Sequence, residues 1–176
     1  MRWRVNTVAV AVTAVVAVAG CSEVVGGSPQ RAQPGVPDPN RSYGYVEDRC
    51  GLLLDGSIQE ALTADHIVRP YSGAVCQYVL ARGPDTIDVT FSWFESGSID
   101  RERALAADRG ATVSEKVVER HQVFLARRDT TGAACSATAA AGTGVLSWWV
   151  QFRGQRSGDP CPDAEKLLSA TLQADM

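Results

Sequence analysis

Histidine, lysine, methionine and long apolar runs are scarce in this chain of 176 residues. It holds two histidines, two methionines and only two lysines among its 17 basic residues. The formal net charge of −3 comes without a block of like charges, which excludes the basic surface that nucleic-acid binding requires. No G-x-S-x-G motif, C-x-x-C pair or metal-ligand cluster occurs. The sequence therefore predicts no catalytic residue, metal site or cofactor.

The amino terminus has the pattern of an export signal. Met1–Arg4 carries two arginines, and Val5–Ala19 is almost purely alanine and valine. As a helix this apolar stretch would reach about 22 Å, short of the roughly 30 Å of hydrocarbon in a bilayer. Its length favours a signal peptide over a membrane span.

Val18-Ala19-Gly20-Cys21 follows and is similar to the lipobox of bacterial lipoprotein signal peptides. In such signals the cysteine sulfur receives a diacylglyceryl group before cleavage of the Gly-Cys bond. We predict that residues 1–20 are removed and that acyl chains, palmitate among them, on Cys21 hold the protein at the extracytoplasmic face of the cell membrane. The alternatives are an uncleaved apolar anchor and an ordinary secretory signal.

A tether is predicted between the lipidation site and the folded domain. Residues 21–46 are rich in proline, glycine and polar side chains, without a period of 2 or 3.6. Such a segment buries too little apolar surface to offset the entropy of ordering, so we expect it to be disordered. Residues 47–176 are then expected to form one domain.

Four cysteines remain once Cys21 is assigned to lipid: Cys50, Cys76, Cys135 and Cys161. An even number in an exported chain predicts two disulfides, with three possible connectivities. We favour sequential pairing, because it closes two loops of similar length and joins a helical region to a strand in each. Each bridge would stabilise the fold by about 3.5 kcal/mol. The other two connectivities stay open.

The rest of the chain predicts an α+β fold. Strict alternation of apolar and polar residues in Thr86–Phe94 predicts a half-buried strand. Further strands are expected at Cys76–Arg82, Thr112–Val118, Gln122–Arg127, Ala134–Ala140 and Val145–Phe152. Helices are expected at Ser57–Ala64, Ser98–Arg109 and from Asp159-Pro160 onward. We expect a two-layer sandwich: an antiparallel sheet of about six strands, helices on one face, and two disulfides.

Phe94 and Trp149 are the candidate binding residues. In Thr86–Phe94 the apolar face ends at Trp93, so Phe94 lies on the polar face, and the same parity places Trp149 on the polar face of its strand. If helices cover only the other face, the two rings form an aromatic binding platform. The alternative is a loop that folds over them and makes a second small core.

Both histidines are interpreted as surface residues. His66 lies in a predicted loop and His121 in a predicted turn. A catalytic role would require one of them to meet a serine, aspartate or glutamate in a concave pocket.

Several cysteine-, glycine- and aromatic-containing stretches carry a family resemblance: Arg49–Leu53, Gly73–Tyr78, Phe91–Ser98, Gly132–Cys135, Gly144–Val150 and Asp159–Cys161. Together they resemble an actinobacterial lipoprotein family known as domain of unknown function 3558, and within it the mycobacterial LprC-like lipoproteins. The resemblance implies a cell-envelope lipoprotein and supports the pairing of the four domain cysteines. It supplies no catalytic residue.

The sequence thus favours a non-enzymatic lipoprotein whose domain is a binding or accessory module for an envelope protein or an apolar envelope molecule. One alternative is a small hydrolase or transferase acting on envelope lipid or glycan. Another is a structural spacer without a ligand.

Overall fold

The computed structural model describes residues 36–154 and 158–174, which belong to a compact unit spanning residues 33–176. The predicted signal peptide, the lipidation site Cys21 and residues 21–35 of the predicted tether lie outside the described residues.

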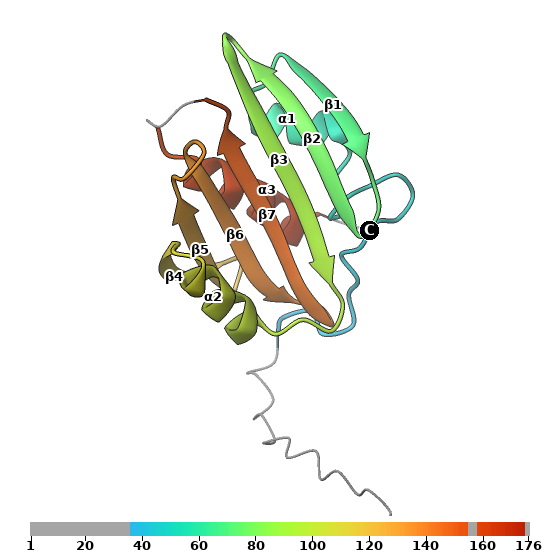
Figure 1. The fold of residues 1–176 in the computed structure, drawn as a ribbon. Helices are drawn as coiled ribbons and strands as arrows, with labels where there is room; N and C mark the ends of the chain where they lie inside the picture. The colour runs from blue at the N-terminus through green and yellow to red at the C-terminus, as the bar shows by residue number, and fades with distance from the viewer. Residues whose placement is uncertain (1–35, 155–157, 175–176) are drawn as a thin grey trace, which may run out of the picture. The chain divides into compact units, whose positions relative to one another are not determined.

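Seven strands form one antiparallel sheet in the order β1-β2-β3-β7-β6-β5-β4 (Figure 1). The strands are β1 (His66–Tyr71), β2 (Val75–Arg82), β3 (Asp85–Phe94), β4 (Thr112–Val118), β5 (His121–Arg128), β6 (Ala134–Ala141) and β7 (Gly144–Phe152). The helices are α1 (Asp55–Ala61), α2 (Ile99–Asp108) and α3 (Cys161–Gln173). Two meanders, β1 to β3 and β4 to β7, therefore meet where β3 pairs with β7.

The main core lies between the sheet and the helices α1 and α3, which Figure 1 shows behind the strands. Alternate residues of β3 and β7 point into it, so Phe91 lies opposite Trp148 in register, with ring centroids 5.0 Å apart. The Trp148 indole N–H donates to Thr171 Oγ1 of α3 at 2.8 Å. The fully buried tryptophan thus has a partner for its only polar atom.

The predicted α+β class is confirmed, but the helices do not share one face. In Figure 1, α2 lies in front of the sheet, where it contacts β4, β5 and β6. It covers a second apolar cluster that includes Phe124 and Ala126, whereas Val123 belongs to the main core. The cause is that β5 is apolar on both faces, and a strand of that kind needs a cover on each side.

The seventh strand, β1, occupies a segment predicted to be a loop. It pairs antiparallel with β2, and its register shifts between Val68 and Tyr71. Pro70 lies within that shift, where an edge strand tolerates a residue without a backbone N–H. The proline and the absence of clean alternation hid this strand in the sequence.

The predicted tether is wrong over its described part, residues 36–46. Tyr43 is fully buried, and its ring lies 5.8 Å from that of Trp93. The Arg41 guanidinium donates to the carbonyl of Ala174. One tyrosine buries enough surface to dock a segment whose average composition is that of a linker.

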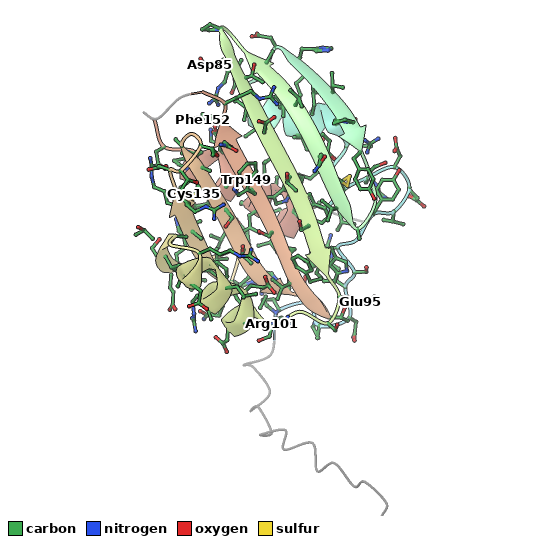
Figure 2. The ribbon with its side chains drawn as sticks, in the orientation of Figure 1. Asp85, Glu95, Arg101, Cys135, Trp149 and Phe152 are labelled. Atoms are coloured by element: carbon green, nitrogen blue, oxygen red, sulfur yellow. A yellow bond between two sulfur atoms is a disulfide. The ribbon has the colours of Figure 1, made fainter. Side chains whose placement is uncertain are left out.

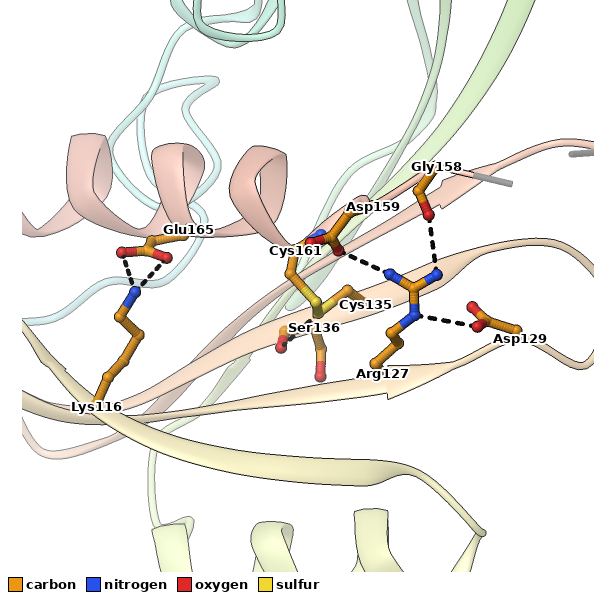
Figure 3. The surroundings of a disulfide bond; sticks show 9 residues. All are labelled: Lys116, Arg127, Asp129, Cys135, Ser136, Gly158, Asp159, Cys161 and Glu165. Carbon is orange, nitrogen blue, oxygen red and sulfur yellow. Dashed lines mark hydrogen bonds and ion pairs between the residues drawn. A yellow bond between two sulfur atoms is a disulfide. The ribbon is translucent and has the colours of Figure 1, made fainter. Parts of the chain in front are cut away.

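Both favoured disulfides are confirmed, Cys50–Cys76 and Cys135–Cys161. The second joins β6 to the first turn of α3 (Figure 3). Beside it, Arg127 donates to Asp159 Oδ1 and to the carbonyl of Gly158, each at 2.9 Å. These contacts fix the start of α3 against β5 and β6.

Candidate functional site

One part of the sheet surface carries no helix. The helix α2 packs on one face of the sheet, where it covers β4, β5 and β6. On that same face the described residues place no helix over β1, β2 and β3 (Figure 1). We call this helix-free area, together with the part of β7 beside β3 that carries Trp149, the open face. It is the face onto which the sequence places Phe94 and Trp149.

The structure places both candidate residues on the open face. In the pairing of β3 with β7, Thr90 lies opposite Trp149 and Phe94 lies opposite Val145. Figure 2 labels Trp149 on β7. The Phe94 side chain is 43% exposed and Trp149 is partly exposed. Four residues of strand separate the two positions, about 13 Å. The rings are accessible but too far apart to form one contiguous pair, and their role in binding stays a prediction.

A third ring, Tyr71 of β1, joins them and was missed in the sequence. Its side chain is 58% exposed. Tyr71 lies opposite Gln77, Gln77 opposite Thr90, and Thr90 opposite Trp149, so one row of side chains crosses four strands. The strand spacing places Tyr71 about 14 Å from Trp149. The sequence evidence for a strand around Tyr71 was the apolar pair Ile67-Val68. Pro70 counted against a strand there.

Small uncharged polar side chains line the surface between the rings. Ser92 and Ser147 are opposite each other in register, and the Ser147 hydroxyl bonds that of Thr138 at 2.8 Å. Asp88 of β3 is charged, and the guanidinium of Arg153, the residue after β7, makes a bidentate contact with its carboxylate. Hydrogen bonding to Asp88 raises the pKa of Arg153. The middle of the open face is therefore neutral.

The histidines differ from each other. His66 is exposed at the start of β1, as predicted for a surface residue. The prediction for His121 is wrong, since its ring is 4% exposed. Its Nδ1 lies 2.7 Å from the carbonyl oxygen of Glu119, and its Nε2 lies 3.0 Å from Asp38 Oδ1. Both partners are acceptors, so both bonds are donated only when the ring carries two protons.

Asp38 connects this histidine to the start of the domain. Its carboxylate also accepts the backbone N–H of Gly142 at 3.1 Å and the hydroxyl of Tyr43. Burial raises the pKa of Asp38, but the hydrogen bonds from Tyr43, His121 and Gly142 outweigh it and lower the pKa. Burial, together with the bond to Asp38, raises the pKa of Tyr43. We call these four residues the Asp38 clasp. It joins residue 38 to the β4–β5 and β6–β7 turns.

Within residues 36–154 and 158–174 no group of three or more histidine, cysteine, aspartate or glutamate side chains is arranged to hold a metal ion. In the same residues no helix has the length and apolar character needed to cross a membrane.

The fold and the site define a small disulfide-linked α+β domain that displays aromatic rings on a helix-free sheet face. The chain belongs to the DUF3558 family: the family model, described as a protein of unknown function, matches residues 16–174.

Two relatives are each named "Putative lipoprotein LprB", one from Mycobacterium bovis and one from Mycobacterium tuberculosis. Each is 27% identical over 181 residues, which cover 98% of this chain and 98% of the relative. The predicted family is confirmed, and these relatives carry the LprB name where the sequence resembled LprC-like proteins. No solved structure matches this chain.

Proposed function

We propose that the protein is a lipoprotein of the cell envelope, held by acyl chains on Cys21 at the extracytoplasmic face of the membrane. Its domain is a non-catalytic module that binds an envelope protein through the open face. The lipoprotein names of its relatives and the lipobox-like Val18–Cys21 segment support the anchor. Two disulfides fit an oxidising compartment outside the cytosol.

The observation that carries the binding proposal is the set of three accessible rings, Tyr71, Phe94 and Trp149, spread over a neutral sheet surface. Large aromatics supply most of the energy of protein interfaces, where they act as anchors separated by weaker contacts. Tyr71 and Phe94 each lie about 13–14 Å from Trp149, a spacing that suits an interface of protein size better than the enclosed pocket of a small ligand. We therefore favour a protein partner here.

A small hydrolase or transferase is the second candidate, and the contact of His121 with Asp38 is the observation in its favour. Two features count against a catalytic histidine. The ring is 4% exposed, and each of its nitrogens faces an acceptor oxygen within the domain. A base needs a nitrogen that can take a substrate proton, so the arrangement supports a structural role.

In-cell photocrosslinking tests the proposal. A photoreactive phenylalanine analogue is placed at position 94, at position 149 or, as the control, at Lys166 of α3 on the opposite face. We expect the same envelope protein to be captured from 94 and 149 and not from 166. The yield from 149 should fall when Tyr71 and Phe94 are both replaced by alanine, because both rings lie on the same surface.

Equal capture from all three positions would overturn the use of the open face. A 149 crosslink that is unchanged by Tyr71→Ala and Phe94→Ala would do the same. Absence of any specific adduct would leave the spacer hypothesis as the better account.

A further inference from the structure

A ligand-sized cavity of about 390 Å³ lies between α2 and the β4–β5 hairpin. It is separate from the open face, since neither Phe94 nor Trp149 lines it. Its apolar lining includes Ile99, Phe124 and Ala140, all buried members of the second apolar cluster. A volume near the lower end of the range for small-molecule sites fits one short chain rather than a lipid with two or three.

The sequence of α2 explains why this space is not filled. Ile99, Arg103 and Ala106 follow the i, i+4, i+7 spacing of one helix face, and the outer two pack against the sheet cluster. The middle position is Arg103, which lines the cavity and forms ion pairs with Asp100 and Glu115. On the sheet side of the cavity, the β6 residue in the lining is Ala140, whose side chain is a methyl group. A helix with a large apolar residue at 103 would close the gap.

Arg120 provides the cavity with a cation that has no carboxylate partner among the described residues. Arg103 has two such partners, whereas Arg120 has no ion pair in residues 36–154 and 158–174. Its backbone is left-handed, with φ of 66°, in a turn where asparagine or glycine would be less strained. Glu119, the other residue of that turn, is held by tertiary contacts, since its carboxylate accepts hydrogen bonds from Ser169 and Gln173. The Arg120 side chain makes no such contact among the described residues.

The cavity also lies beside the point where the chain enters the domain. Val36 and Pro37 form part of its wall, and the next residue is Asp38 of the clasp. Val36 lies 15 positions after Cys21, a distance of at most about 50 Å for a fully extended chain. With the proposed anchor in place, the mouth of the cavity stays within reach of amphiphiles at the membrane surface.

From the apolar floor, the free guanidinium and the size, we propose that this cavity binds a single-chain anionic amphiphile, an alkyl carboxylate whose chain lies on Phe124 and Ala140 and whose carboxylate pairs with Arg120. The site goes beyond the proposed function: its access to membrane amphiphiles rests on the proposed anchor, but the site and the open-face binding can fail separately. No covalent step is involved. The protein would hold or carry the amphiphile outside the cytosol.

The test uses the mature lipidated protein, which begins at Cys21, in phosphatidylcholine vesicles and a decanoate analogue that carries a diazirine in its chain. After irradiation, mass spectrometry locates the label. We expect saturable labelling confined to the peptides containing Ile99, Phe124 or Ala140, with competition by decanoate and at least about tenfold weaker competition by decyltrimethylammonium, because the paired charge is reversed.

Three variants sharpen the result. Arg120→Asn removes the charge and suits the left-handed backbone, so we expect about tenfold weaker labelling without a loss of stability in denaturant unfolding. Arg101→Gln on α2 (Figure 2) is the matched control, because Arg101 is exposed and does not line the cavity; it should label as the parent protein does. Ala140→Leu fills the floor and should abolish labelling.

Labelling that does not saturate, or that spreads evenly over the surface, would overturn the proposal. So would equal effects of Arg120→Asn and Arg101→Gln. If Ala140→Leu proves unfolded, the two arginine variants still decide the matter.

Discussion

Trp148 and Trp149 are neighbours in the chain and lie on opposite faces of β7. Trp148 is fully buried and donates to Thr171, whereas Trp149 is partly exposed on the open face. We predict that Trp148→Ala lowers the free energy of unfolding by about 3–5 kcal/mol, since it leaves a large cavity. Trp149→Ala should lower it by about 1 kcal/mol. Urea unfolding of both variants is the measurement, and similar losses would show that the open face is covered.

Alanine substitutions at Gly83 and Gly142 distinguish the cost of a strained backbone from the cost of a steric overlap, because both glycines have a left-handed backbone. Gly142 has φ of 50° and Gly83 has φ of 58°. A Cβ at Gly142 would overlap the carbonyl oxygen of Arg41, whereas a Cβ at Gly83 meets nothing within 4 Å.

Gly83→Ala should therefore destabilise the protein by about 1–2 kcal/mol through backbone conformation alone. Gly142→Ala adds the overlap and should cost roughly 1–3 kcal/mol more. Thermal unfolding monitored by circular dichroism measures both. Equal effects would mean that residue 41 is not held against the β6–β7 turn.

Among the elements, those with a strong local signal were predictable. The alternation of Thr86–Phe94 located β3 (Asp85–Phe94), and Ser98 with Gly110 bracketed α2. The edge strand β1 was not predictable. Pro70 is tolerated there because the pairing with β2 is irregular at that point, and no local pattern in the sequence indicates this irregularity. The side of the sheet on which α2 lies was likewise decided outside the helix itself, by the two apolar faces of β5.

The Asp38 clasp makes the attachment of residues 36–43 sensitive to acid. Because the pKa of Asp38 is lowered in the folded state, its ionised form stabilises the fold above its unfolded pKa of about 4, and this contribution is lost as the pH falls below that value. We predict that Asp38→Asn is less stable than the parent protein at pH 7 and that the difference shrinks toward pH 3.

Urea unfolding at pH 7, 5 and 3 measures this difference. Asp108→Asn, an exposed residue at the end of α2, is the matched control and should keep the pH dependence of the parent protein. A difference between Asp38→Asn and the parent that is constant across this range would show that the carboxylate is not linked to folding.

For the whole molecule, location and folding depend on different cysteines. Cys21→Ser is expected to move the protein out of the membrane fraction, because the thiol that receives lipid is gone, while both disulfides of the domain still form. Fractionation and intact mass spectrometry before and after reduction measure both properties.

The reverse control is Cys135→Ser with Cys161→Ser. It should remain membrane-bound and lose about 3.5 kcal/mol of stability, because one long loop is no longer closed. Recovery of unprocessed Cys21 protein from the soluble cell interior would contradict the lipid anchor.

The sequence by itself determined the strand alternation, the position of α2, the even cysteine count and the lipobox-like segment. Apart from the cysteine count, these features are encoded by residues a few positions apart. The sequence misplaced the first helix, which was predicted at Ser57–Ala64 and spans Asp55–Ala61. Only the tertiary structure decided that Tyr43 docks the supposed tether, that His121 is buried against Asp38, and that α2 leaves a cavity over Ala140. Each of these depends on which distant segments meet, and a hydrogen bond across 83 positions of chain leaves no local pattern to read.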